Sequence, residues 1–203
     1  MLGVHAREAG LARGLKWMIN RSGSVIAAVM WLPELQEHTM DRDSFWKIID
    51  DARNSASDVY GVAPLVVEHL QTLESDDIIS FGQNMSDILD ETYRWDLWAV
   101  GYIVNGGCSD DGFEYFRAWL VAQGRERFEA ALENPNVIGD WAEPDKNECE
   151  DLMSAGWDAF HAKTGDGFPS GAIAGKRSAD PAGESWEEEQ LEKLYPELCK
   201  KFF

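Results

Sequence analysis

Cysteine is scarce in this chain, and so are basic residues and long apolar runs. The three cysteines, Cys108, Cys149 and Cys199, lie far apart, and no two of them have CxxC spacing. A disulfide framework needs an even set of cysteines and a structural zinc site needs closely spaced ligands, so the sequence favours neither. Unpaired cysteines suit a reducing compartment, and a cytoplasmic location is therefore expected.

Acidic residues outnumber basic ones by 37 to 18, which gives a net charge of −19. Nucleic-acid binding requires clustered Lys and Arg that neutralise phosphates, and the sequence has no such cluster, so we expect no nucleic-acid partner. A surface of this charge attracts cationic surfaces, and the expected partner is another protein with a basic surface. The composition, 44% hydrophobic and 27% charged, is typical of a soluble globular domain with one core.

The longest apolar run extends only from Val25 to Leu32. It is much shorter than the roughly 20 residues that cross a bilayer, so no membrane association is predicted. Trp31, Pro33 and Glu34 make a poor small-residue cleavage site, which disfavours a secretory signal.

The first 39 residues differ from the rest in charge. They contain four basic and three acidic residues, a net charge of +1, so a charge of −20 belongs to residues 40–203. Met40 directly precedes a well-formed helix start at Asp41. We therefore expect residues 1–39 to be an N-terminal extension, flexible or loosely helical, and residues 40–203 to be a single helical domain.

From Asp41 onward the apolar residues recur at helical spacing, as Phe45, Ile48, Ile49 and Ala52 do. Helices are predicted over residues 62–73, 75–89 and 95–104, from Ser109 to Gly124, through Phe128 and Leu132, from Asp145 to Phe160, and from Ser185 onward. Ser75, Asp145 and Ser185 are the expected helix caps. Residues 95–104 are apolar on nearly every side, which indicates a central buried helix. The predicted fold is all-α, a compact multi-helix domain around that helix, with irregular loops such as residues 164–183.

The polar side chains that could carry chemistry are concentrated between Tyr93 and Leu132. They are Asp96, Ser109, Asp110, Asp111, Glu114 and Arg117. Their oxygen atoms could hold a divalent cation, but Ser followed by acids is also the ordinary start of a helix. No metal and no cofactor are therefore predicted, and catalytic roles stay open.

Asp96 and Arg117 are lone charges in aromatic surroundings, and a buried charge must be paired. We expect them to form a buried ion pair, because a tight turn after Asn105 would make their helices antiparallel. Trp98 and Phe116 are expected to meet in the centre of the domain, because both lie on the apolar faces of adjacent helices.

His69 falls on an apolar stripe, which predicts a hydrogen-bonded core histidine, and no histidines have HxxxH or HExxH spacing. Cys108 precedes a helix start, where a thiol pKa can be lowered, but a structural cysteine is favoured because no matching His and Asn are evident.

Several segments together resemble a bacterial family known as domain of unknown function 4240. The segments are the Phe45-Trp46 pair, the block YRWDLWAVGYIVNGGCSDDGFEYFRAWLVAQGRERF from Tyr93, the segment WDAFHAKTGDGFP from Trp157 and the closing YPELCKKF from Tyr195. The resemblance covers about residues 40–203. It implies a compact, mainly helical, soluble bacterial protein, and it brings no established activity, cofactor or catalytic residue.

Two classes of function follow from the residues. The preferred one is a protein-binding or regulatory module, because every candidate residue has a sufficient structural role. The alternative is a small hydrolase or other enzyme that uses the carboxylates and Arg117. A pocket that collects these groups would favour the enzyme, whereas carboxylates held in caps and ion pairs would favour the module.

The charge break at Met40 predicts that residues 1–39 are dispensable for folding. A chain that begins at Met40 should unfold cooperatively, with a free energy of unfolding close to that of the full chain in thermal denaturation. A loss of more than about 2 kcal/mol would show that Trp31 and its neighbours contribute to the core.

Overall fold

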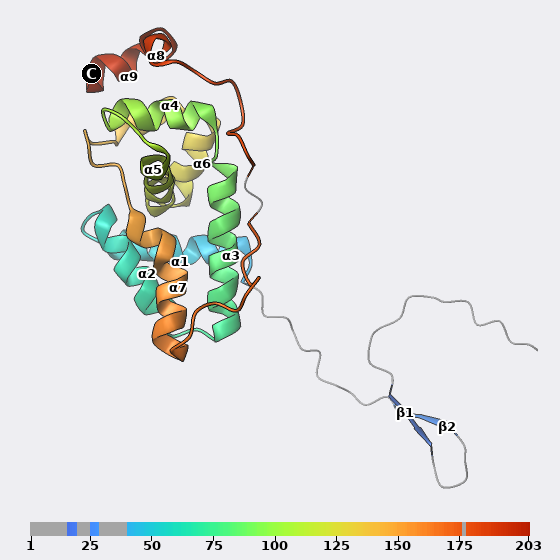
Figure 1. The fold of residues 1–203 in the computed structure, drawn as a ribbon. Coiled ribbons are helices and arrows are strands. Elements are labelled where there is room, and N and C mark those ends of the chain that lie inside the picture. Colours follow the sequence, from blue (N-terminus) through green and yellow to red (C-terminus); the bar gives the residue numbers. More distant parts are fainter. Residues whose placement is uncertain (1–15, 20–24, 29–39, 176–177) are drawn as a thin grey trace, which may run out of the picture. The chain divides into compact units, whose positions relative to one another are not determined.

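The computed structural model describes residues 16–19, 25–28, 40–175 and 178–203 (Figure 1). The chain divides into two units, residues 1–38 and residues 39–203. In the first unit, strand β1 (Lys16–Ile19) pairs with strand β2 (Val25–Ala28) in antiparallel fashion, with Lys16 opposite Ala28. At these positions the loose helix that we considered is wrong, and the β-branched residues of β2 agree with the strand. The other residues of the predicted extension lie outside the described part.

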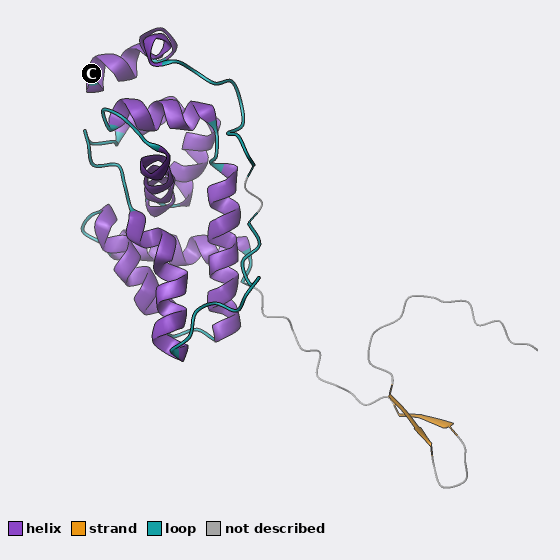
Figure 2. Cartoon of the chain, in the orientation of Figure 1, coloured by secondary structure: helices purple, strands orange, loops and turns teal. Residues whose placement is uncertain are grey.

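The second unit is built from α-helices and two 3₁₀ turns (Figure 2). The α-helices are α1 (Arg42–Ser55), α2 (Val62–Leu70), α3 (Ser75–Glu91), α4 (Trp95–Val104), α5 (Asp110–Ala122), α6 (Arg125–Glu133), α7 (Glu150–Thr164), α8 (Glu188–Leu194) and α9 (Pro196–Phe202). The 3₁₀ turns are η1 (Val59–Gly61) and η2 (Pro135–Asp140). Within residues 40–175 and 178–203 the only strand-like pairing is a single bridge between Arg94 and Ala182. The all-α prediction is confirmed.

Two helices begin at the caps that the sequence suggests. The Asp41 side chain accepts a hydrogen bond from the Ser44 amide at 2.8 Å, and Ser109 Oγ accepts one from the Gly112 amide at 3.1 Å. These bonds satisfy amides that have no partner inside their helix.

Three other predicted caps are wrong by one to four residues. Ser75 is the first residue of α3, after Glu74. Helix α7 starts after Cys149, because the Asp145 amide donates to the Val104 carbonyl of α4 instead of entering a helix. Helix α8 starts after Glu187, whose capping box is completed by Gln190.

The core of the second unit surrounds α5. Nine of its thirteen residues are buried, and α7 packs against α2, α3 and α5. Helix α4 lies between α5 and the C-terminal helices (Figure 1), with six of its ten residues buried. Trp95, Asp96 and Trp98 of α4 remain partly exposed, so the first turn of the predicted central helix is not enclosed on every side.

Helices α4 and α5 cross steeply and are not antiparallel: α4 runs across the view of Figure 1, whereas α5 is seen nearly end-on. Trp98 stacks on Phe113, with ring centroids 4.7 Å apart, and it remains partly exposed, so its expected place in the centre beside Phe116 is wrong. Phe116 lies against Gly101, where an added Cβ would come within 3.0 Å of the ring. The absence of a side chain at Gly101 permits this close approach of the two helices.

Replacement of Phe116 by alanine should lower the free energy of unfolding by about 3–5 kcal/mol, because the ring is wholly buried and its loss leaves a cavity. Trp98→Ala should cost less, since Trp98 is partly exposed. Trp157→Ala on α7 is the control, because that side chain is 45% exposed and should contribute less than about 1 kcal/mol. Denaturant unfolding measures all three, and equal costs for Phe116→Ala and Trp157→Ala would contradict this description of the core.

Candidate functional site

The structure separates the six candidate residues of the sequence analysis into three places. The residues are Asp96, Ser109, Asp110, Asp111, Glu114 and Arg117. Asp96 stands at the start of α4, and its carboxylate is held by Arg94: Nε donates to Oδ1 at 3.0 Å and Nη2 donates to Oδ2. Arg94 Nη1 also donates to the Leu132 carbonyl at 2.9 Å. The expected pair between Asp96 and Arg117 is wrong, because the steep crossing of α4 and α5 carries Arg117 away and Arg94 is within reach.

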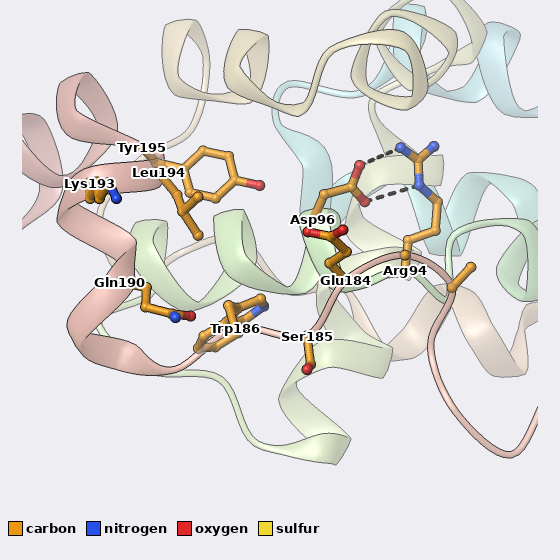
Figure 3. A pocket seen from close by; sticks show the side chains of 11 residues that line it. Arg94, Asp96, Glu184, Ser185, Trp186, Gln190, Lys193, Leu194 and Tyr195 are labelled. Carbon is orange, nitrogen blue, oxygen red and sulfur yellow. Dashed lines mark hydrogen bonds and ion pairs between the residues drawn. The ribbon is translucent and has the colours of Figure 1, made fainter.

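Asp96 lines a pocket of about 510 Å³ (Figure 3). The pocket lies between the start of α4, the segment 182–186 and helix α8, which supplies Gln190 and Lys193. Asp96 is the only member of the predicted cluster among its lining residues.

Trp186 attaches the C-terminal segment to helix α4 at this pocket. Its Nε1 donates to the Trp95 carbonyl at 2.8 Å, and its ring meets Trp95 and Tyr102 edge to face. Burial, with the Asp96 charge as a further cause, raises the pKa of Tyr195. The pocket therefore holds neutral Tyr195 beside a carboxylate whose two oxygen atoms are already bound by Arg94.

Ser109, Asp110 and Asp111 form the start of α5. Ser109 is the cap, and the two acids are exposed in the first turn, where they favour the positive end of the helix dipole. Among the residues that the structure describes, no group of three or more His, Cys, Asp or Glu side chains is arranged to hold a metal ion.

Arg117 is buried, with 4% of its side chain exposed. Its Nη1 donates to the Leu89 carbonyl near the end of α3 at 2.7 Å, and the guanidinium lies over the rings of Tyr93 and Phe113 at 5.2 and 5.0 Å. Glu114 contributes a longer ion pair at 3.9 Å. Arg117 thus joins α5 to the end of α3, which is a structural role.

Glu148 and Glu150 are the residues that the sequence analysis missed. The Cys149 amide donates to the Tyr115 carbonyl at 3.0 Å, and this bond places the start of α7 beside α5. Glu150, burial, Asp111 and Glu114 all raise the pKa of Tyr115. Glu148 and Asp110 both act on the neighbouring Cys108, and Glu148 lies beside Gly112 of α5. Five carboxylates therefore share one region, which we call the acidic face: Asp110, Asp111, Glu114, Glu148 and Glu150.

Cys108 is not an activated nucleophile. Burial, followed by the nearby charge of Glu148, raises the pKa of its thiol to about 12, so the helix start does not lower it. The structural interpretation of this cysteine is thereby supported.

The predicted core position of His69 is wrong. His69 is exposed on α2 and is not a core residue, because the buried face of that helix runs through Val62, Val66 and Leu70. His161 stacks on the exposed Trp157 with ring centroids 4.9 Å apart.

The family model described as "Protein of unknown function (DUF4240)" matches residues 40–162. The chain belongs to this family. No curated protein and no solved structure matches this chain. The DUF4240 match includes the acidic face, whereas the pocket at Asp96 also requires Trp186, Gln190 and Lys193 from beyond the matched residues.

Across the described part of this DUF4240 chain, no helix is both long enough and apolar enough to cross a membrane.

The contacts of Arg94 predict that it matters more for stability than Asp96 does. Arg94→Met loses the ion pair and the bond to Leu132, and should lower the free energy of unfolding by about 2–3 kcal/mol. Asp96→Asn keeps an oxygen acceptor and should cost about 1 kcal/mol.

Lys47→Met is the matched control, because the Lys47–Asp51 pair is exposed and should contribute less than about 0.5 kcal/mol. Denaturant unfolding of the three variants measures the difference. If Arg94→Met is no more destabilising than Lys47→Met, the pair at Asp96 does not stabilise the fold.

Proposed function

We propose that this domain is a protein-binding module that recognises a basic partner through the acidic face. The observation that carries the proposal is the gathering of carboxylates from α5 and α7 around Tyr115, although these helices are separated by α6 and η2 in the sequence. A field of one sign steers a partner of the opposite sign and sets its orientation.

Most of the acidic face is unpaired. Among the described residues, Asp110, Asp111, Glu148 and Glu150 form no ion pair with a lysine or arginine. Carboxylates without an ion-pair partner in their own domain are free to pair with the cations of another protein. This availability supports a binding role.

The enzyme alternative has less support. Catalytic groups must lie within hydrogen-bond reach of one reacting atom. Asp96 is bound by Arg94 in its own pocket, Arg117 is buried against the end of α3, and Asp110 is exposed at a helix start. The carboxylates are thus held in an ion pair or a helix start, the arrangement that favours the module.

A cytoplasmic location belongs to the same proposal. Cys108, Cys149 and Cys199 are all free thiols, which suits a reducing compartment.

The proposal predicts that the acidic face dominates binding of a cationic probe. Asparagine and glutamine should replace the five carboxylates of the acidic face, and calorimetry should measure binding of a synthetic oligolysine peptide. At about 0.15 M salt, where charges beyond about 8 Å are screened, the dissociation constant should rise at least about tenfold.

The control removes the same charge from other helices. It replaces five exposed glutamates by glutamine: Glu68, Glu126, Glu133, Glu189 and Glu197. Both variants are first compared by thermal unfolding, because acids in the first turn of α5 contribute to its stability. Equal weakening by the two sets would mean that net charge alone attracts the peptide, and the acidic face would then have no special role.

A further inference from the structure

The pairing of the arginines divides them into two groups. The structure describes the side chains of Arg42, Arg53, Arg94, Arg117, Arg125 and Arg127. Four of them form ion pairs with carboxylates at 3.9 Å or less. Arg53 and Arg127 form none with any described residue, although acidic residues outnumber basic ones by 37 to 18 in this chain. Both line the same pocket.

This pocket has a volume of about 430 Å³, and none of the five carboxylates of the acidic face is among its lining residues. Arg53 comes from the last turn of α1, Arg127 from α6, and Trp141 and Lys146 from the segment after η2. Small-molecule sites are commonly concave and of roughly 300–1,000 Å³. We call it the arginine pocket.

The side chains of the arginine pocket are held in place without a ligand. Arg127 Nη1 donates to Gln123 Oε1 at 2.8 Å, and the guanidinium lies over the Trp141 ring at 5.4 Å. Trp141 in turn stacks on buried Trp119, with centroids 5.2 Å apart. Tyr60 donates from its hydroxyl to the Lys146 carbonyl at 2.8 Å. Such preorganisation lowers the entropic cost of binding.

The charge of the arginine pocket is positive. Arg53, Arg127 and Lys146 face only two acidic lining residues, Asp58 and Glu143, so the local charge is +1 in a chain of −19. Asp58 accepts from the Gly61 amide at 3.0 Å, and Glu143 pairs with Lys146 at 3.0 Å. Neither carboxylate forms an ion pair with an arginine. Glu148 follows the lining residue Asn147, and its charge is, after burial, among the causes that raise the pKa of Tyr60, whereas salt screens the carboxylates that lie farther away.

We propose that the arginine pocket binds a small organic anion. Its carboxylate or phosphate group accepts hydrogen bonds from Arg53 and Arg127, because the planar guanidinium fork matches either group. Its body fills the space beside Tyr60 and Trp141. This activity is separate from the protein-binding role, since it uses none of the carboxylates of the acidic face.

Calorimetric titration of the full chain tests the proposal with four probes: benzoate, phenyl phosphate, inorganic phosphate and benzyl alcohol. We expect one of the two aromatic anions to bind most tightly and the neutral alcohol not to bind. The order of benzoate and phenyl phosphate distinguishes a carboxylate ligand from a phosphate ligand. Arg53→Gln and Arg127→Gln should each raise the dissociation constant about tenfold or more.

Arg125→Gln is the matched control. Arg125 lies on the same helix as Arg127, but it pairs with Asp43 and Glu129 and does not line the pocket, so its loss should leave affinity unchanged. Arg53→Gln removes no ion pair with a described residue and should leave the melting temperature unchanged, which keeps the test valid if Arg127→Gln destabilises the fold.

Three outcomes would overturn the proposal. The first is no binding of any anion at about 10 mM. The second is equal weakening by Arg125→Gln and Arg53→Gln, which would indicate unspecific charge attraction. The third is tighter binding of an oligoglutamate peptide than of either aromatic anion, with the same dependence on Arg53, which would make this a docking site for an acidic protein segment.

Discussion

Helix α5 carries two adjacent side chains, Phe116 and Arg117, that are both buried and that hold different neighbours. Phe116 lies against Gly101 of α4, and Arg117 donates to the Leu89 carbonyl at the end of α3. A buried guanidinium is stable only where its donors find acceptors, and a buried ring only where it is closely packed. The position of α5 is therefore determined jointly with those of α3 and α4. The Cys149 amide donates to the Tyr115 carbonyl of α5, and this bond determines where α7 begins.

The two proposed binding surfaces use different residues of α5, and they adjoin where Glu148 of the acidic face follows Asn147 of the arginine pocket. The acidic face includes Asp110 and Asp111 at the start of α5, whereas Gln123 at its end holds Arg127 in the arginine pocket. This order agrees with the helix dipole, which favours negative charge at the start of a helix and positive charge at its end. One helix thus contributes to a surface suited to cations and to a pocket suited to anions, within a domain whose net charge is strongly negative.

Both surfaces consist of residues within the part of the chain that the DUF4240 family model matches. The pocket at Asp96 is different, because segment 182–186 and helix α8 form one of its walls. The bonds of Trp186 to Trp95 and of Ala182 to Tyr93 and Trp95 attach that wall to α4. The C-terminal segment therefore completes this pocket, whereas the acidic face and the arginine pocket do not depend on it.

The sequence by itself determined the helical class, most of the helix positions and the caps at Asp41 and Ser109. These features depend on residues within one or two turns of each other, so spacing is enough to predict them. The same local pattern also identified Ser109, Asp110 and Asp111 as a helix start. It overestimated the burial of His69, because a stripe of apolar residues does not show where the neighbouring helices end.

Only the tertiary structure decided which charges meet. Asp96 binds Arg94 and not Arg117, Glu150 approaches Tyr115, and Arg53 and Arg127 share a pocket although 73 positions separate them. The distances between these charges depend on the angle at which their helices cross. That angle depends on how closely side chains pack between the helices, as the Phe116 ring packs against Gly101. Spacing along the chain tells which residues share a face of one helix, but it contains no measure of how two faces fit together.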